Sequence, residues 1–271
     1  MKISVVTPSF NQGQFIEECI ESVLAQNHED FEHIIIDAGS TDSTLEVLQK
    51  YPHLKWISEP DDGQCDAINK GVQKATGDYI LWLNADDYMM SNAFNEVDNV
   101  VSKNKTIDFI YGHVCFLDEN TNEKKISYHI PFLYSFVFFS VYSLPSTGSF
   151  IKASVFKANP LDLNFHMVMD TEWVLRTGRS IKTRLLNQVL VTFRVSDDNK
   201  TAENIKHGFV SDQHLAERKR YKEMHIDSTN RLLSKNLFRL YLKCGHSVFK
   251  FLYYMLKAKS LIMYKLKFIL R

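Results

Sequence analysis

The sequence of 271 residues is poor in cysteine and contains no long apolar run. Its cysteines follow no metal-type spacing, which fits a reduced, cytoplasmic protein rather than a disulfide scaffold. No apolar stretch reaches the roughly 18 residues that predict a membrane-spanning helix. No signal peptide is expected, because an apolar strand begins directly after Met1-Lys2. The four cysteines are Cys19, Cys65, Cys115 and Cys244.

The loop after the first predicted strand lacks a glycine-rich phosphate-binding pattern. Residues 8–13 read PSFNQG, without the G-x-G-x-x-G spacing that lets a backbone approach a pyrophosphate. The sequence therefore argues against a nicotinamide-dependent enzyme. A nucleotidyltransferase would also need a glycine-rich, basic loop here, so this class of enzyme is a less favoured alternative for the function of the chain.

Acidic residues are absent from the last part of the chain. Residues 228–271 contain ten Lys or Arg and no Asp or Glu, although the whole chain has 32 of each kind. Basic residues recur every four positions at Arg231, Lys235, Arg239 and Lys243, and aromatic residues follow. The pattern predicts a basic amphipathic extension that docks on an anionic membrane surface. The alternative is helices packed on the main domain; no nucleic-acid partner is expected, because no RNA-binding motif is present.

Residues 126–151 contain no Asp, Glu, Lys or Arg. Within them, residues 132–144 lie between Pro131 and Pro145. This stretch is too short to span a bilayer, so it predicts a buried helix or, alternatively, a lipid-facing patch.

Short apolar runs alternate with amphipathic stretches over the first ninety residues. This alternation predicts βαβ units and a parallel sheet. A further helix at 92–102, a strand at 108–114 and a hairpin near 118–120 follow. The expected early strands are 2–7, 31–37, 54–58 and 79–83.

The strand at 79–83 ends abruptly in Asn84-Ala85-Asp86-Asp87. Adjacent carboxylates are poorly placed in a core unless they are paired or bound to metal. The carboxyl ends of parallel strands form the ligand-binding edge of open α/β sheets. Oxygen ligands there are appropriate for a hard divalent ion that carries a diphosphate. An acidic turn before a helix is the alternative.

Several segments together resemble the inverting nucleotide-sugar glycosyltransferases of the GT-A fold, in the large family that includes bacterial polysaccharide and lipopolysaccharide transferases. The resemblance covers about residues 1–205 and implies an α/β fold, with a Rossmann-like, mostly parallel central sheet, helices on both faces and a C-terminal helical extension. It divides the chain into a nucleotide-sugar-binding half (1–115), an acceptor and catalytic-base half (116–205) and the extension (206–271). The matching segments are 7–11 with 20–24, 37–42, 59–71, 83–87 and 169–173.

The resemblance also implies which residues hold the donor. Asp37 would accept the imide N–H of a pyrimidine base; its alternative role is to cap the next helix with Ser40 and Thr41. Lys70 would lie near the ribose, or else be a solvated residue on a helix surface. Asn84 would reach the ribose, and Lys200 would close on the diphosphate. The full set of expected donor-binding residues is Pro8, Phe10, Asn11, Asp37, Asp66, Lys70, Asn84, Ala85 and Lys200.

The same resemblance assigns the chemistry to three acids. Residues 84–87 correspond to the family's D-x-D motif, in which Asp86, assisted by Asp87, would hold Mn²⁺ or Mg²⁺. The first acid of the motif is replaced here by the amide Asn84. Asp170 matches the catalytic base; a helix-start acid stabilised by the helix dipole is the alternative, and both roles can hold at once. Thr147 and Ser196 also depart from the common residues of the family.

The resulting expectation is an inverting glycosyltransferase that moves a sugar from an NDP-sugar to an acceptor hydroxyl. The acceptor would be a lipid-linked glycan in cell-surface polysaccharide or lipopolysaccharide assembly, at the cytoplasmic face of the cell membrane. A non-catalytic sugar-nucleotide-binding protein is the alternative that the departures at Asn84, Thr147 and Ser196 favour.

Overall fold

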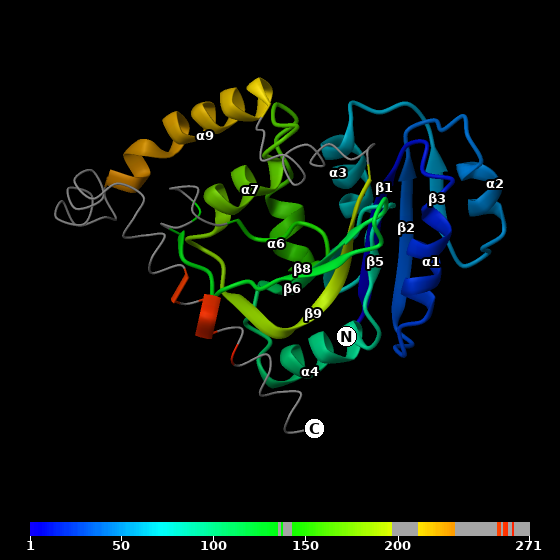
Figure 1. Ribbon diagram of the computed structural model, residues 1–271, viewed down its shortest axis with the longest axis horizontal. Coiled ribbons are helices and arrows are strands. Elements are labelled where there is room, and N and C mark those ends of the chain that lie inside the picture. The colour runs from blue at the N-terminus through cyan, green and yellow to red at the C-terminus, as the bar shows by residue number, and fades with distance from the viewer. Residues whose placement is uncertain are drawn as a thin grey trace.

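The computed structural model describes residues 1–134, 137, 143–196, 211–230, 254–255, 257–259 and 262. Within them, helices flank one curled sheet of nine strands (Figure 1). Lys200, most of the helix expected at 132–144 and nearly all of residues 228–271 lie outside this described part. No helix within it is long and apolar enough to cross a membrane.

The first half of the chain alternates strand and helix, as the sequence predicts. Neighbouring strands run in the order β3-β2-β1-β4, and all three pairings are parallel. The carboxyl ends of these four strands therefore meet along one edge. The elements are β1 (Ile3–Ser9), α1 (Ile16–Leu24), β2 (Phe31–Asp37), α2 (Thr44–Gln49), β3 (Lys55–Ser58), α3 (Gln64–Lys74) and β4 (Tyr79–Trp82).

The second half is mixed in direction, so the sheet as a whole is less parallel than expected. The order continues β4-β8-β6-β9-β5, in which β6–β9 alone is parallel, and β7 pairs with β6. The expected hairpin joins β6 and β7, and such a short connection requires antiparallel neighbours. The elements are β5 (Tyr88–Met89), α4 (Ala93–Lys103), β6 (Phe109–Asp118), β7 (Lys124–Ser127), β8 (Ser149–Lys152), α6 (Ala153–Ala158), α7 (Met169–Thr177), β9 (Thr183–Val195) and α9 (Asp212–Asn230).

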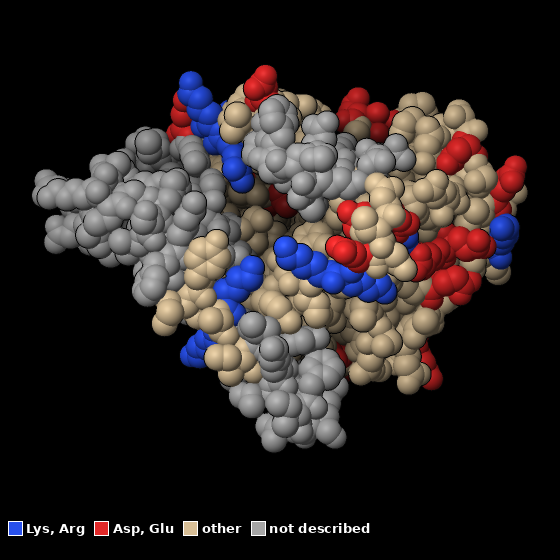
Figure 2. Space-filling model, in the orientation of Figure 1, with Lys and Arg blue, Asp and Glu red and all other residues tan. Residues whose placement is uncertain are grey.

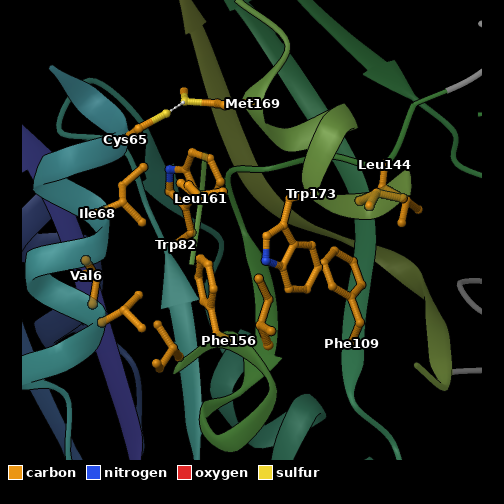
Figure 3. Close-up of a cluster of buried hydrophobic side chains, with 14 of the residues drawn as sticks. Val6, Cys65, Ile68, Trp82, Phe109, Leu144, Phe156, Leu161, Met169 and Trp173 are labelled. Atoms are coloured by element: carbon orange, nitrogen blue, oxygen red, sulfur yellow. Dashed lines mark hydrogen bonds between the residues drawn. The ribbon is translucent and has the colours of Figure 1, made fainter. Parts of the chain in front are cut away.

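Alternate side chains of the central strands enter different cores, because successive strand residues point to opposite faces of a sheet. Ile80 and Trp82 pack with α3, α6 and α7 in one cluster (Figure 3). Tyr79 and Leu81 pack with α1 and α4 in another. Burial on both faces explains the continuous apolar run of β4.

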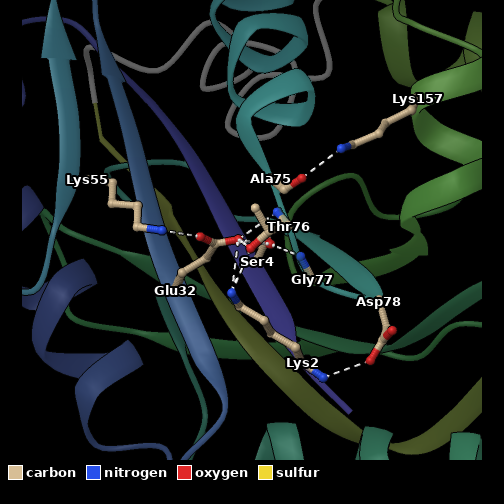
Figure 4. Close-up of polar contacts among 9 residues, drawn as sticks. All are labelled: Lys2, Ser4, Glu32, Lys55, Ala75, Thr76, Gly77, Asp78 and Lys157. Atoms are coloured by element: carbon tan, nitrogen blue, oxygen red, sulfur yellow. Dashed lines mark hydrogen bonds and ion pairs between the residues drawn. The ribbon is translucent and has the colours of Figure 1, made fainter.

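A buried carboxylate fastens the amino-terminal edge of the sheet, opposite the ligand-binding edge (Figure 4). Glu32 accepts hydrogen bonds from Ser4 Oγ (2.6 Å) and Thr76 N (2.7 Å) and pairs with Lys55 Nζ (2.7 Å). Burial opposes ionisation of Glu32, but the Lys55 ammonium and the hydroxyl and amide donors outweigh it and lower the pKa of this group to about 2. The network ties β1 and β2 to the turn that leads into β4.

Candidate active site

A cavity of about 650 Å³ opens at the carboxyl ends of β1–β4. The first turn of α7 and the end of β9 close its other side, so both halves of the chain form its wall. Its size is typical of a small-molecule site. The lining residues are Pro8, Ser9, Phe10, Gln12, Ala38, Pro60, Asp61, Gly63, Gln64, Ala67, Trp82, Asn84, Ala85, Asp86, Ser146, His166, Met167, Met169, Asp170 and Phe193.

The two acids that follow β4 have different environments. The backbone N–H of Asp87 donates to Asn84 O (3.1 Å) and closes a tight turn. Asp86 lines the cavity, whereas Asp87 is only 1% exposed and does not. Burial, and then the nearby Asp86 charge, raises the pKa of Asp87 well above its usual range.

Asn84 holds Asp87 in this buried position. Its Nδ2 donates to Asp87 Oδ2 (3.0 Å), and its Oδ1 accepts hydrogen bonds from Gln64 Nε2 and Trp82 Nε1, both at 3.0 Å. The amide expected to reach a ribose therefore has three partners within the protein. An acid at position 84 would place a second carboxylate against Asp87.

Arg194 of β9 is a residue of the site that the sequence did not reveal. Its backbone N–H donates to Asp87 Oδ1 (3.0 Å) and its Nε to the Asp86 carbonyl oxygen (2.9 Å). The rest of the guanidinium, which is buried, pairs with Glu18 and Glu119. Its charge fixes the acidic turn to α1 and to the end of β6. No pattern in the sequence indicates this role, since the three partners come from distant segments.

Asp170 lies in the first turn of α7, as predicted, and lines the same cavity as Asp86. Its Oδ1 accepts hydrogen bonds from the N–H (2.6 Å) and hydroxyl (3.2 Å) of Thr171. Burial raises the pKa of Asp170, which the Thr171 donors and the Arg218 charge only partly oppose. A carboxylate with a raised pKa is a better proton acceptor near neutral pH.

The expected donor-binding residues divide into two groups. Pro8, Phe10, Asn84 and Ala85 line the cavity, and Phe10 is 56% exposed at its wall, so its ring is free to stack on a planar ligand. Four others do not line it: Asn11, Asp37, Asp66 and Lys70.

Contacts within the protein account for these four residues. Asp37 is fully buried and accepts hydrogen bonds from Ser40 Oγ, Ser58 Oγ and two backbone N–H groups, so it holds the loop after β2. Lys70 pairs with Asp66 (3.0 Å) on the surface of α3, which agrees with its solvated-helix alternative. Asn11 Oδ1 accepts from the N–H of Thr41 (2.9 Å) and ties the loops after β1 and β2 together.

A divalent ion would have few protein ligands at this edge. Among the described residues, no three His, Cys, Asp or Glu side chains are grouped closely enough to hold a metal. Asp86 is the carboxylate of the acidic turn that lines the cavity. Mg²⁺ commonly takes one or two carboxylates together with phosphate oxygens and water. The residues present therefore fit an ion that arrives with a diphosphate, held by Asp86, rather than a closed protein cage.

The half of the chain that supplies most of the cavity wall is rich in acidic residues. Residues 1–115 contain 19 Asp or Glu and 7 Lys, and acidic side chains predominate on the part of the surface that carries α1 and α2 (Figure 2). An anionic ligand would enter against this field unless a cation accompanied it.

A mixed sheet covered by helices, with an acid-lined cavity at the carboxyl ends of its parallel strands, defines an α/β protein of the GT-A class. The sequence model described as "Glycosyl transferase family 2" matches residues 4–160, more than half of the chain. The chain belongs to this family, and the resemblance stated from its motifs is confirmed.

Relatives and solved structures agree with this assignment. The chain is 40% identical over 91 residues to a putative teichuronic acid biosynthesis glycosyltransferase of Bacillus subtilis, covering 31% of this chain and 36% of the relative. It spans only 21% to 38% of the length of several curated relatives. Residues 1–349 of S. aureus TarS in complex with UDP share the fold with a TM-score of 0.68 and 16% identity, over 91% of this chain and 73% of that one. A mannosyltransferase of Pyrobaculum calidifontis in complex with GDP-Man and Mn²⁺ aligns with a TM-score of 0.56 and 13% identity, over 98% and 86%.

Proposed function

We propose that the protein is an inverting, metal-dependent glycosyltransferase that moves a sugar from an NDP-sugar to an acceptor hydroxyl. One observation carries the proposal: Asp86 and Asp170, far apart in sequence and from different halves of the fold, line a single cavity of about 650 Å³. Membership of the family and the nucleotide complexes of two structural neighbours support it.

The two acids divide the chemistry. Asp170 takes the proton of the acceptor hydroxyl, and the oxygen attacks the anomeric carbon as the bond to the diphosphate breaks on the opposite side. Displacement in line inverts the anomeric configuration. Asp86 would hold a divalent ion that accompanies the diphosphate, and such an ion would neutralise charge on the leaving group. Arg194 and Asn84 keep the acidic turn in place while Asp170 accepts the proton.

The acceptor that we propose is a lipid-linked glycan of a cell-surface polysaccharide, reached at the cytoplasmic face of the membrane. The Bacillus relative is a putative glycosyltransferase of teichuronic acid biosynthesis, which supports a role in polysaccharide assembly. The ten basic residues of 228–271 support attraction to anionic lipid. Three apolar side chains of this stretch, Tyr254, Met255 and Ile262, are each more than half exposed, which also favours contact with a lipid surface.

The test is a panel of UDP-, GDP- and dTDP-sugars with Mn²⁺ or Mg²⁺, screened by thermal shift and then by donor turnover. A bound donor should raise the melting temperature of the wild type through ligand linkage. Asp170→Asn should reduce turnover by about 10²-fold or more and leave the thermal shift unchanged. Asp86→Asn should abolish the metal-dependent part of the shift. Asp62→Asn, an exposed acid before α3, is the matched control and should change neither.

The pH dependence gives a second readout of the same assignment. Because the base acts in its charged form, turnover should fall as the pH drops through the pKa of Asp170, which burial places above the ordinary value of 3.8. A wild type that binds a donor without any turnover would instead favour a non-catalytic sugar-nucleotide-binding protein. Loss of donor binding in Asp170→Asn would show that the base is misassigned.

A further inference from the structure

The helix α9 inserts one carboxylate into the backbone just before α7. Glu217 Oε2 accepts hydrogen bonds from the N–H groups of Met167 (2.8 Å), His166 (3.1 Å) and Val168 (3.2 Å). Glu217 Oε1 also accepts from the His166 N–H (3.2 Å). Although it belongs to a helix rich in exposed residues, Glu217 is only 8% exposed. One side chain therefore satisfies three consecutive backbone donors.

These donors belong to the segment that delivers Asp170 to the cavity. His166 and Met167 line the cavity themselves, Val168 is the N-cap of α7, and Asp170 is in the first turn of this helix. The first N–H groups of a helix have no partner within it, and an acid there also complements the helix dipole. No side chain of the N-cap itself makes a capping hydrogen bond. Glu217 instead binds the N–H groups of the N-cap and of the two residues before it, so it fixes the segment through which the chain enters α7.

Glu217 is itself held in place by its neighbours on α9. Tyr221, one turn further along, is fully buried in the cluster that contains Trp173 of α7. The Arg220 guanidinium lies 5.3 Å from the Phe165 ring centre, and Gln213 Nε2 donates to Glu217 Oε1 (3.1 Å). Figure 1 shows α9 running beside α7 at the end of the molecule away from α2. These contacts hold the Glu217 carboxylate in place, so its hydrogen bonds fix the position of residues 166–168.

We propose that Glu217 is a positioning residue for Asp170: by binding the N–H groups of residues 166–168, it sets the start of α7 and the place of the catalytic base at the cavity wall. The inference rests on the function proposed above, in which Asp170 is the base. It gives α9 a part in catalysis, although none of the described side chains of α9 lines the cavity. Arg218 on the same helix adds a charge that acts on Asp170.

The experiment compares Glu217→Gln and Glu217→Asp with Glu223→Gln, an exposed glutamate of the same helix, all in the full chain. Gln keeps the volume of Glu but replaces one acceptor oxygen by a donor, which the backbone N–H groups repel. We expect donor turnover to fall by about 10- to 100-fold in Glu217→Gln, since a displacement of about 1 Å can cost that much. The KM for the donor should stay within about twofold. Glu217→Asp should recover part of the rate.

Two measurements do not depend on turnover. Carboxyl NMR titration should show the Asp170 midpoint falling toward its ordinary value in Glu217→Gln, because a loosened loop admits water around a carboxylate whose pKa burial has raised. Amide hydrogen exchange should accelerate at residues 166–168. Neither should change in Glu223→Gln, and melting curves identify any variant that is unfolded.

The possible outcomes separate the two proposals. A folded Glu217→Gln protein with the wild-type turnover and the wild-type Asp170 midpoint would overturn the positioning role. A wild type that turns over no donor would end the proposed function, while the midpoint and the amide exchange would still decide whether Glu217 positions Asp170. If Glu217→Gln does not fold, Glu217→Asp supplies the same three readouts.

Discussion

At the scale of single residues, the amide at position 84 is the informative departure from the family's acidic motif. A buried carboxylate needs donors, because an unsatisfied acceptor costs about 1–3 kcal/mol. Asn84 Nδ2 supplies one of them to Asp87, and the Arg194 N–H supplies another. The amide therefore stabilises the acidic turn, and this turn positions Asp86 at the cavity wall. The hydrogen bonds of Asn84 explain the amide at this position by its support of Asp87 rather than by the binding of a ligand.

Replacing Asn84 by Asp should accordingly destabilise the protein. Asp87 Oδ2 would lose its donor at 3.0 Å and face a like charge, so we expect the free energy of unfolding to fall by about 1–3 kcal/mol. Urea unfolding monitored by fluorescence measures the change. Asn164→Asp is the matched control, because Asn164 also donates to an aspartate, Asp162 (2.8 Å), but is exposed. Equal losses in both variants would contradict the role given to Asn84.

Asp86 and Asp170 both line the cavity, as the sequence predicts, whereas only part of the expected donor-binding set does, for a physical reason. Asp86 and Asp170 each follow a recognisable element start or end, and backbone geometry alone brings them to the cavity. Asp37 ends β2 in the same way, yet its oxygens are used by Ser40 and Ser58. Whether a polar side chain turns to a ligand or to its neighbours depends on contacts that spacing does not encode.

At the scale of elements, β9 joins the two halves of the site. It is parallel to β6 and antiparallel to β5, the two-residue strand that follows the acidic turn. The sequence predicts the parallel half well, because each strand there is a separate apolar run. It gives no sign of β5, which is too short to show a period, or of the insertion of β8 between β4 and β6. Gly148 reaches β8 with a φ of 73°, where a Cβ would lie 2.5 Å from Val191, so only glycine permits this close approach.

The Arg194 contacts predict how β9 stabilises the acidic turn. Lys in place of Arg194 keeps the charge but cannot reach Glu18, Glu119 and the Asp86 carbonyl together, because it lacks the planar fork. We expect Arg194→Lys to lower the free energy of unfolding by about 2 kcal/mol. Arg184→Lys, at an exposed position of the same strand, should change it little. Chemical unfolding of both variants measures the difference. Equal stability of Arg194→Lys and the wild type would refute the stabilising role given to the Arg194 contacts.

At the scale of the whole molecule, the acidic half and the basic extension lie at opposite ends of the sequence, and α9 lies between them in the chain. The half that forms most of the cavity is acidic, so the anionic donor that we propose would bind best together with a cation at Asp86. The basic extension lies at the other end of the sequence. The structure places α9 between these regions in the chain and packs it on α7, with Tyr221 in the core. A boundary near residue 205, which the family motifs suggest, would separate Glu217 and Tyr221 from the helix that they support.

Two shortened chains test this division. The chain of residues 1–230 retains α9, so it should keep the wild-type melting temperature and donor turnover but lose sedimentation with anionic phosphatidylglycerol vesicles. Each basic residue near such a surface contributes about 1 kcal/mol of attraction, so the binding of the full chain should also weaken with salt.

The chain of residues 1–205 loses the buried Tyr221 and should be destabilised by about 3 kcal/mol or more, with turnover reduced as in Glu217→Gln. Vesicle binding by residues 1–230 equal to that of the full chain would refute membrane docking through the basic extension, and a fully stable, active 1–205 chain would show that α9 is dispensable.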